Sequence, residues 1–431
     1  MVTRYLIADD MTGALEAGAA YLKAGLGVCV PSGLRTAESV PCPWPAAVIV
    51  LSTETRNCDP EVAAQRLRQA LAIITRGGGT LAYKKIDSTL RGPLSAELGA
   101  VLSARPDLRL LVTPANPAAG RTVVDGELLV KGWPVTETPF AHEMLAPVTD
   151  SRVMAVAAVG HEPVSGYLSL AIVRAGPREC AKQMRAAFDR GKRLLFADAE
   201  TEADLVCLVE ATRRMPQVLL VGSGGLAQAL AQSTGRTAVG PPEVQAPQGP
   251  CLFLCGSLHP ANLVQSEMLR DEAGFEWVEV DAETALRDQE AGDSYRAEIV
   301  RRALAALRGS GLALVQLRLR RGASLLPGED QSDAARKLLD FLGDAFATLD
   351  RDCPVPRLFV TGGETAREVC SRLGGQWLRL CRELEPGVVG AELSTPTGTR
   401  LLAAKPGGFG HARTMLQAYQ WLSDPQSFEH Q

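Results

Sequence analysis

The chain has 431 residues, more than one hydrophobic core usually serves, so the length predicts two domains. Hydrophobic residues make up 46% and charged residues 22%, and the formal net charge is -4, so nucleic acid is not an expected partner. No apolar run approaches the roughly 20 residues that cross a bilayer, and the N-terminus lacks a signal-peptide pattern. The ten cysteines are scattered without a C-x-x-C pair, so we expect a cytoplasmic protein with no membrane partner.

Strand-like and helix-like segments alternate through the first half of the chain. Short runs rich in Val, Ile and Leu predict strands, and apolar spacings of three and four predict a helix over 59–75. This alternation is typical of a largely parallel sheet with helices on both faces. Residues 126–135 depart from it, because two short strands around Lys131-Gly132 predict an inserted hairpin. The other strands are predicted at 4–8, 47–51, 80–84, 109–113, 193–197 and 217–221.

Two adjacent acids follow the first predicted strand. Asp9 and Asp10 lie at its carboxyl end, which is the edge of an open α/β sheet where ligands bind. Asp10 or Thr12 could cap a helix that begins near Gly13, which contributes about 1 kcal/mol. Capping accounts for one acid but hardly for both, because adjacent like charges repel unless a cation or a ligand offsets them. We therefore predict that the pair belongs to a functional site.

A second charged cluster follows the strand predicted at 80–84. It lies just before a helix predicted over 93–102, with Pro93 as its first residue. Free amides at a helix start, together with lysine and arginine side chains, predict an anion site. The alternative is a solvated, charged turn. The candidate residues of this cluster are Lys84, Lys85, Asp87, Ser88 and Arg91.

Two further loops of the first half are candidates for the same edge of the sheet. The loop at 113–121 carries Asn116 and Arg121, although Arg121 could equally be a surface partner of a nearby acid. The motif Gly222-x-Gly224-x-x-Ala227 has the spacing of a dinucleotide fingerprint. The chain then enters a Pro-rich segment and does not form the second strand whose end would carry the expected acid. Tight helix–strand packing, or a backbone wall of a cleft, is therefore the preferred interpretation.

Residues 235–250 contain four Pro and three Gly and predict an inter-domain linker. Alternation restarts after them, so we predict domains at 1–234 and 251–424, a tail at 425–431, and an active site in the cleft between the domains. Further strands are predicted at 251–257, 275–281, 312–319 and 357–363, with helices from 260, from about 294, from about 332 and over 412–422.

Three glycine-rich turns follow predicted strands in the second half. No G-x-x-x-x-G-K-[ST] motif occurs, so a P-loop is excluded. Three such turns would still let backbone amides approach a polyphosphate closely. Lys405 could add charge there or stay on the surface. The turns are Gly256-Ser257, Gly362-Gly363-Glu364-Thr365 and Gly407-Gly408-Phe409-Gly410.

Taken together, these segments resemble the four-carbon acid sugar kinase family, which phosphorylates tetronates such as threonate, erythronate and 3-oxo-tetronate. The matching stretches, which run in family order from residue 7 to residue 410, are IADDMTGALEAG, YKKIDSTLRGPLSAE, PANPAAGR, VGSGGLA, the GS at 256–257, VTGGET and KPGGFG. The resemblance implies an N-terminal acid-sugar domain, a C-terminal nucleotide domain, and ATP and Mg²⁺ as cofactors. It leaves a homodimer open.

Matching positions in the family, together with the charged clusters and glycine turns described above, give the predicted site residues. The predicted catalytic residues are Asp9, Asp10, Lys85, Asp87 and Arg91. The predicted substrate-binding residues are Thr12, Lys84, Ser88, Asn116 and Arg121. The predicted ATP-binding residues are Ser257, Gly362, Gly363, Glu364, Thr365, Gly407 and Gly408, and no metal ligand is assigned. Two residues depart from the family pattern: Glu16 stands where Asp is common, and Asn116 where an aromatic residue is common, so substrate choice is open.

The expected reaction moves the γ-phosphoryl group of ATP to the 4-hydroxyl of a tetronate, mainly by positioning and charge stabilisation. Arg91 and Lys85 would bind the substrate carboxylate or the transferring phosphoryl group, and one of the acids would orient or deprotonate the hydroxyl. Mg²⁺ would bridge the β- and γ-phosphates with few protein ligands. The alternatives are an NAD(P)-dependent sugar-acid dehydrogenase that uses the Gly222 turn, and a non-catalytic acid-sugar sensor.

Overall fold

The structure, a computed structural model, describes residues 3–142, 146–234, 242–287, 289–319, 331–426 and 428. The chain divides into two compact α/β units, which confirms the predicted fold class. Unit 1 comprises Met1–Pro41 and Pro45–Val239, and unit 2 comprises Cys42–Trp44 and Gly240–Gln431.

Parts of two predicted segments lie outside the described residues. These are residues 235–241 of the predicted linker and residues 427 and 429–431 of the predicted tail, so both segments stay predictions. Within the described ranges, no helix combines the length and the apolar character needed to cross a membrane.

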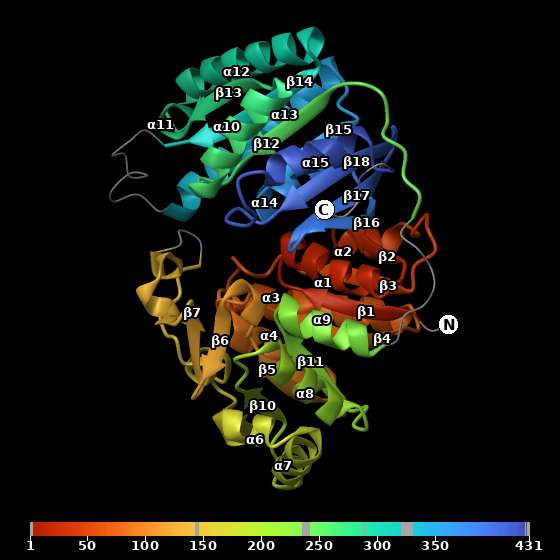
Figure 1. Cartoon of the computed structure of the whole chain (residues 1–431), viewed down its shortest axis with the longest axis vertical. Coiled ribbons are helices and arrows are strands. Elements are labelled where there is room, and N and C mark those ends of the chain that lie inside the picture. The colour runs from red at the N-terminus through yellow and green to blue at the C-terminus, as the bar shows by residue number, and fades with distance from the viewer. Residues whose placement is uncertain are drawn as a thin grey trace. The chain divides into compact units, whose positions relative to one another are not determined.

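Unit 1 is built on a parallel sheet with the strand order β2-β3-β1-β4-β11-β5-β10-β9 (Figure 1). Its strands read as continuous apolar runs because helices cover both faces of the sheet. The six predicted strands are found within one residue at each end, whereas β2 and β9 were not predicted. The strands are β1 (Arg4–Ala8), β2 (Val28–Pro31), β3 (Val48–Ser52), β4 (Thr80–Lys85), β5 (Arg109–Thr113), β9 (Ser165–Leu168), β10 (Leu194–Ala197) and β11 (Val218–Gly222).

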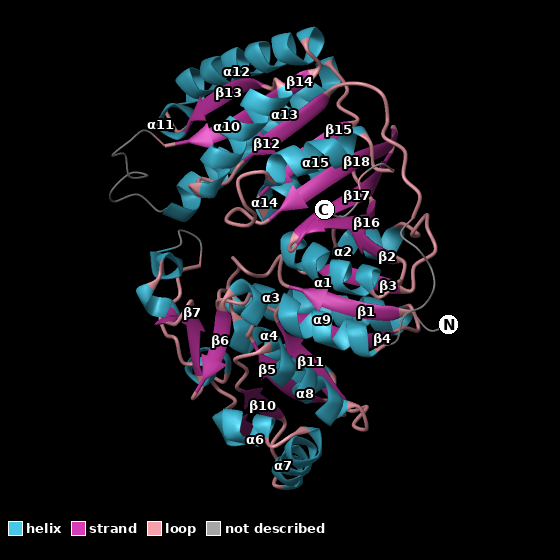
Figure 2. Ribbon diagram, viewed as in Figure 1, coloured by secondary structure: helices cyan, strands magenta, loops and turns pink. Residues whose placement is uncertain are grey.

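The helices of unit 1 divide between the two faces of this sheet (Figure 2). Right-handed crossovers place them according to the direction in which the chain moves along the sheet. Helix α9 contacts α1 and α8 on one face, and α3 contacts α4 on the other. The helix predicted over 93–102 begins at Leu94, with Pro93 as its N-cap residue. The helices are α1 (Met11–Lys23), α2 (Leu34–Ser39), α3 (Pro60–Arg76), α4 (Leu94–Ala104), α5 (Val153–Ala157), α6 (Leu170–Arg174), α7 (Pro177–Asp189), α8 (Glu202–Thr212) and α9 (Gly224–Ser233).

An antiparallel sheet is inserted after β5. The predicted hairpin is present as β7 (Glu127–Val130) and β8 (Trp133–Pro134). The prediction was incomplete, because β6 (Arg121–Val124) also pairs with β7. The turn between β6 and β7 is Asp125-Gly126, whose φ angles are 51° and 76°. An Asp-Gly pair between two strands is a strong sequence signal for a hairpin. Short 3-10 turns flank this sheet: η1 (Pro117–Ala119), η2 (Val135–Glu137), η3 (Pro139–His142) and η4 (Glu162–Val164).

Unit 2 has the strand order β13-β14-β12-β15-β18-β17-β16. Neighbours from β13 to β18 pair in parallel, whereas β17 pairs antiparallel with both β18 and β16. Strands β16 and β17 were not predicted, because the sequence WLRLCRELE does not alternate strictly between apolar and polar residues. The strands are β12 (Cys251–Cys255), β13 (Glu276–Asp281), β14 (Leu312–Arg318), β15 (Arg357–Thr361), β16 (Trp377–Glu385), β17 (Val388–Thr395) and β18 (Gly398–Lys405).

Helices also cover both faces of the sheet in unit 2. Helix α10 contacts α15, while α13 contacts both α12 and α14. The helix expected from about residue 294 begins earlier, at Gln289. The helices are α10 (Ala261–Ala273), α11 (Ala282–Ala285), α12 (Gln289–Gly309), α13 (Gln331–Asp352), α14 (Gly363–Arg372) and α15 (Thr414–Ser423).

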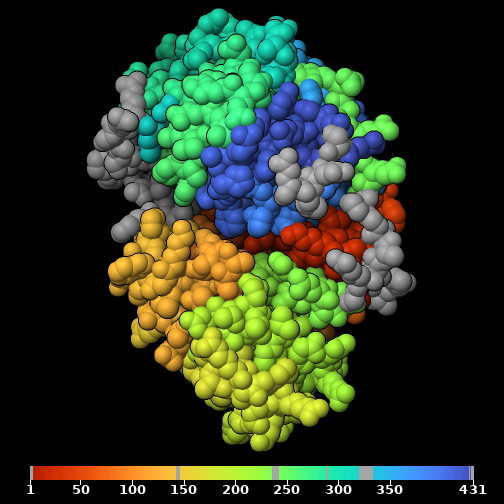
Figure 3. All heavy atoms as spheres, in the orientation of Figure 1, coloured from red at the N-terminus to blue at the C-terminus, as the bar shows by residue number. Residues whose placement is uncertain are grey.

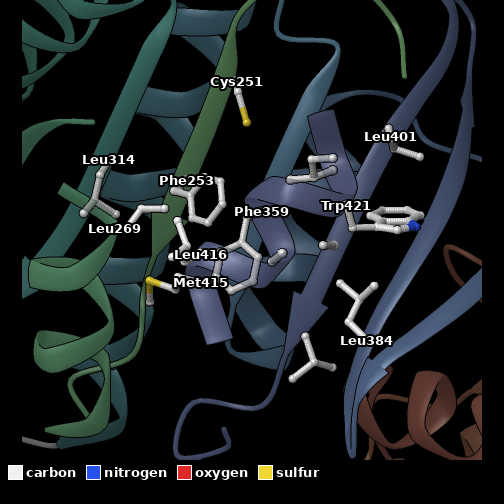
Figure 4. Close-up of a cluster of buried hydrophobic side chains, with 14 of the residues drawn as sticks. Cys251, Phe253, Leu269, Leu314, Phe359, Leu384, Leu401, Met415, Leu416 and Trp421 are labelled. Carbon is white, nitrogen blue, oxygen red and sulfur yellow. The ribbon is translucent and has the colours of Figure 1, made fainter. Parts of the chain in front are cut away.

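The core of unit 2 fixes the strands that carry the glycine turns (Figure 4). The Phe253 ring of β12 stacks on the Phe359 ring of β15, with 4.5 Å between centroids, and meets the edge of Phe275 at 4.8 Å. Trp421 is buried over Gly390, where a Cβ atom would come within 2.6 Å of the indole. Rings packed at these distances hold β12 and β15 in register, so the turns at their carboxyl ends start from fixed points.

Candidate active site

The charged residues predicted in unit 1 gather at one edge of its sheet. Strands β3, β1, β4, β11 and β5 are consecutive neighbours, and the carboxyl ends of parallel strands meet at the same edge. Asp9 and Asp10 follow β1, and Asp87 and Arg91 follow β4. The contacts between these side chains show that the topology brings them together.

Arg56, which was not among the predicted site residues, lies between the acids. Its Nε donates to Asp9 Oδ2 at 2.9 Å, and its two terminal nitrogens donate to the Asp10 carboxylate at 2.7 and 2.8 Å. This guanidinium offsets the two adjacent like charges. Arg56 follows the carboxyl end of β3, so the same strand-edge rule that selected Asp9 would have found it.

The positive charges around Asp9 keep it ionised. Burial raises the pKa of Asp9, but the charges of Arg56, Lys84 and Lys85 outweigh burial and hold that pKa below its ordinary value. Asp9 is 2% exposed, yet its Oδ1 has no hydrogen-bond partner within the described part of the chain. An ionised, buried carboxylate oxygen without a donor is costly unless a ligand supplies one.

Asp10 is committed to local structure, which confirms the capping prediction. Its Oδ1 accepts the backbone N–H of Gly13 at 2.7 Å, and its Oδ2 accepts the hydroxyl of Thr12 at 2.6 Å. Gly13 has no room for a side chain, because a Cβ atom there would lie 2.6 Å from Asp10 Oδ1, 3.3 Å from Lys85 Nζ and 3.5 Å from Asp9 Oδ1. The glycine therefore lets both acids and Lys85 approach the start of α1 closely.

Lys85 pairs with Glu16, one of the two residues that depart from the family pattern. Lys85 Nζ lies 3.0 Å from Glu16 Oε2. Burial lowers the pKa of Lys85, but Glu16 and then Asp9 outweigh it, so the ammonium is retained. The Glu16 carboxyl packs against Gly224, where any Cβ atom would overlap it. The glycine motif at 222–224 therefore serves close packing, in agreement with the preferred interpretation of its sequence.

Lys84 does not reach the site surface. It is fully buried, its Nζ lies 3.0 Å from Glu97 Oε2, and it donates to the backbone oxygen of Lys85 at 2.9 Å. Glu97 also accepts from the hydroxyl of Thr55. This enclosure departs from the predicted substrate-binding role, and it fits an internal pair that joins β4 to α4.

Asp87 and Arg91 form a two-point ion pair in place of an open anion site. Arg91 Nε and a terminal nitrogen donate to the two oxygens of Asp87 at 2.9 and 3.0 Å, and a terminal nitrogen of Arg56 lies 3.7 Å from Asp87 Oδ1. Burial raises the pKa of Asp87, but Arg91 and Arg56 hold it well below its ordinary value. Ser88 lies beside this pair, half-buried.

Asn116 and Arg121 close the loop after β5. Each donates its backbone N–H to the backbone oxygen of the other, at 2.8 and 3.0 Å. The buried Asn116 packs against Gly225, where a Cβ atom would lie 3.2 Å from its Oδ1. Arg121 is half-buried, and its pKa is lowered by burial and by Arg91, although Asp87 and Glu16 oppose this.

The three glycine turns of unit 2 converge. They follow β12, β15 and β18, which are consecutive neighbours in the sheet. A Cβ atom at Gly256 would overlap Thr365, and one at Gly407 would overlap Ser257. The first turn therefore contacts both others, and the predicted ATP-binding residues form one group.

Lys405 stabilises the last turn from inside, contrary to the expectation of a surface or added charge. It is fully buried, and its Nζ donates to Asn262 Oδ1 at 2.8 Å and to the backbone oxygens of Gly407 and Phe409, each at 3.0 Å. Burial lowers the pKa of Lys405 to about 8. These carbonyl groups point inward, onto the lysine.

Comparison with known proteins matches the two units to two family models. Residues 5–230 match a sugar-binding N-terminal domain, and residues 252–415 match a nucleotide-binding C-terminal domain. A D-threonate kinase of Cupriavidus necator is 32% identical, over 97% of this chain and 98% of that protein. The chain belongs to the four-carbon acid sugar kinase family.

Other members of the four-carbon acid sugar kinase family match over a similar length. A 3-oxo-tetronate kinase of Pectobacterium atrosepticum is 28% identical, over 95% of this chain and 97% of that protein. A solved structure of a protein from Salmonella typhimurium LT2 matches with a TM-score of 0.79 at 23% identity, over 97% of this chain and 99% of that one. The solved structure thus has the same fold.

Proposed function

We propose that this chain is an ATP-dependent kinase that transfers the γ-phosphoryl group to the 4-hydroxyl of a tetronate. The observation that carries the proposal is that this member of the family has both a charged cluster in unit 1 and a group of glycine turns in unit 2. Unit 1 holds ionised acids beside arginines and a lysine, and unit 2 holds three joined glycine turns. The relatives named as D-threonate kinase and 3-oxo-tetronate kinase support the substrate class.

The dehydrogenase alternative finds no support at the Gly222 turn. A Cβ atom at Gly222 would overlap the backbone oxygen of Thr113, and one at Gly224 would overlap the Glu16 carboxylate. A carboxylate against the start of α9 occupies the place of a dinucleotide pyrophosphate and repels it. The sensor alternative finds no support either, since the curated relatives are named as kinases.

In this proposal Asp9 is the acid that receives the 4-hydroxyl. Asp10 is held by Arg56 and by its capping bonds, and Asp87 is held by Arg91, whereas Asp9 Oδ1 has no donor within the described residues. A carboxylate with a lowered pKa is a weak base, so its main effect is to orient the hydroxyl for in-line attack. Lys85 supplies positive charge close to Asp9 and Asp10.

The nucleotide phosphates would bind at the glycine turns of unit 2. Backbone N–H groups of Ser257, of the turn at 362–365 and of Gly407 and Gly408 can donate to phosphate oxygens without a Walker lysine. Within the described residues no group of three or more His, Cys, Asp or Glu side chains could hold a metal ion. In the proposed reaction, Mg²⁺ would be held mainly by phosphate oxygens and water, and it would neutralise charge on the phosphates.

The test is a coupled assay of ADP release with D-threonate, D-erythronate and 3-oxo-tetronate. We expect turnover of at least one of them, and Asp9→Asn to lower kcat by about 10²- to 10⁴-fold while the protein stays folded. Asp107→Asn, at an exposed acid of the same unit, is the matched control and should keep wild-type kcat. No ADP release with any tetronate, together with NAD(P)H binding in a titration, would refute the proposal.

A further inference from the structure

The turn after β3, which carries Arg56, contains a backbone conformation that residues with a side chain avoid. Glu54 has a φ of 51°, in the left-handed region, which costs free energy because its Cβ atom crowds the backbone. Arg66 of α3 holds this turn from one side, because it donates to the backbone oxygen of Glu54 at 2.6 Å. Such a conformation persists only where its surroundings hold it, and it is concentrated at functional sites.

The residues on both sides of Glu54 are fixed by buried hydroxyl groups. The hydroxyl of Thr53 donates to the backbone oxygen of Ala8 in β1 at 2.9 Å, and the hydroxyl of Thr55 donates to Glu97 Oε1 in α4. Thr53 is 2% exposed, Thr55 is 0% exposed and Glu97 is 1% exposed. A hydrogen bond is stronger in a buried, low-dielectric place than in water, so these two contacts hold the left-handed turn between β1 and α4.

The fixed turn determines where Arg56 lies. The backbone N–H groups of Thr55 and Arg56 donate to the backbone oxygen of Asp9 at 2.8 and 3.3 Å. On the other side Gly92, in the loop that leads into α4, packs against the turn, since a Cβ atom there would lie 3.1 Å from the backbone oxygen of Arg56. With its backbone enclosed in this way, Arg56 reaches both Asp9 and Asp10 with one guanidinium group.

We propose that Thr55 and Glu97 are positioning residues: they hold the left-handed turn so that Arg56 stays against the two acids that follow β1. This inference rests on the proposed function and adds to it two residues that are too buried to touch the substrate. Without the Thr55 hydroxyl, the strained turn can relax to an ordinary conformation, which moves Arg56 away from the acids. A displacement of about 1 Å in a site can cost about 10²-fold in rate. The alternative is that Glu97 only neutralises Lys84 and that Thr55 adds only stability.

The test compares Thr55→Val, which keeps the shape of the side chain but removes the hydroxyl, with Thr55→Ser, which keeps the hydroxyl. For Thr55→Val we expect kcat with the tetronate to fall about 5- to 50-fold, because the acids lose their alignment. The KM for ATP should not change, because the glycine turns belong to unit 2. Thr55→Ser should keep kcat within about 2-fold of wild type, since its hydroxyl can still donate to Glu97.

Thr212→Val is the matched control. The hydroxyl of Thr212 is also buried in unit 1 and donates to the backbone oxygen of Val209 at 2.8 Å, but it belongs to α8. This helix is in the yellow-green part of the chain in Figure 3 and lies apart from the red part that contains β1. The control loses a buried hydrogen bond without touching the turn after β3, so its kcat should equal that of the wild type.

A pH profile separates positioning from lost stability. Burial raises the pKa of Asp9 and Arg56 lowers it, so a displaced Arg56 leaves Asp9 with a higher pKa. The acid limb of kcat/KM for the tetronate should therefore move up by about 0.5 to 1 pH unit in Thr55→Val. It should stay in place in Thr55→Ser and in Thr212→Val. The other charged groups near Asp9 belong to β4 or precede α1: they are Lys84, Lys85 and Asp10.

A glycine substitution tests whether the left-handed conformation is the cause. Glycine adopts this conformation without a steric cost, so Glu54→Gly added to Thr55→Val should bring kcat back to within about 3-fold of wild type. This double variant also decides the question if Thr55→Val alone does not fold. The inference is wrong if Thr55→Val keeps the wild-type kcat and acid limb, if Thr212→Val loses as much activity, or if the added glycine restores nothing. Each of these outcomes leaves the proposed function standing as long as the wild type releases ADP. No ADP release by the wild type would refute the proposed function instead.

Discussion

Replacing Arg56 by Met should destabilise unit 1 more than any single surface ion pair could. Arg56 makes three hydrogen bonds to Asp9 and Asp10, and these side chains are only 2% to 13% exposed. Removing one partner of a buried pair leaves uncompensated charge, which costs about 3–5 kcal/mol. Lys84 and Lys85 still act on Asp9, so we expect the lower end, about 3 kcal/mol at pH 7.

The pH dependence identifies the cause of that loss. In the wild type the folded-state pKa of Asp9 is lowered, so its stabilisation is present above the unfolded value of 3.8 and is lost as the pH falls through the folded pKa. Without Arg56, burial acts with less opposition and raises that folded pKa. The difference between wild type and Arg56→Met should therefore be largest near pH 7 and shrink towards pH 4.

Urea unfolding followed by circular dichroism at pH 7 and pH 4.5 measures the effect, and hydrogen exchange of peptides from residues 5–23 localises it. Arg56→Lys is the matched control. It keeps the charge but cannot span two carboxylates, so it should lose about 1–2 kcal/mol. A loss below about 1 kcal/mol for Arg56→Met, or a loss independent of pH, would show that the acids do not depend on this guanidinium.

Three further changes test the two halves of the site. Gly13→Ala would place a methyl group 2.6 Å from Asp10 Oδ1 and displace this carboxylate from Arg56, so kcat/KM for the tetronate should fall at least about 10-fold with little change in the KM for ATP, as steady-state kinetics would show. Gly407→Ala forces a methyl group onto Ser257 and should raise the KM for ATP about 10-fold, whereas Gly309→Ala, with open space around it, should leave that KM unchanged. Because burial lowers the pKa of Lys405 to about 8, deprotonation above that pH should loosen the last turn and raise the KM for ATP between pH 7 and 9. The folded-state pKa of Lys405 lies below its ordinary 10.5, so the free energy of unfolding should rise with pH between about 8 and 10.5, and a thermal unfolding scan should exclude unfolding as the cause of the higher KM.

The sequence predicted the elements better than it predicted the partners within the site. Apolar runs of a sheet buried on both faces are visible without a structure, so β1 and β5 were placed at their exact ends. The antiparallel strands β16 and β17 were missed because the register shifts between Leu380 and Arg382 and between Glu383 and Glu385 break the apolar–polar alternation of β16.

Charge pairing was beyond the sequence for a physical reason. Lys84 and Lys85 are adjacent, but neighbouring residues of a strand point to opposite faces, so one meets Glu97 and the other meets Glu16. Which lysine is enclosed depends on what packs against each face. Arg56 could have been found, since it follows a strand at the same edge, but its role depends on how the chain turns after β3.

In each unit the predicted site lies at the carboxyl ends of its own parallel strands, but the chemical groups at these strand ends differ between the two units. Unit 1 presents charged side chains, whose length and partners can vary: Glu16 reaches Lys85 only because Gly224 leaves room for its carboxyl group. Unit 2 offers the backbone N–H groups of its glycine turns. The buried Lys405 does not add a charge there, because it donates inward to carbonyl groups of the last turn. Most substitutions leave a backbone N–H donor in place, whereas they change a side-chain partner directly. We therefore expect the choice among tetronates to depend on the acid-sugar side, where Glu16 lies.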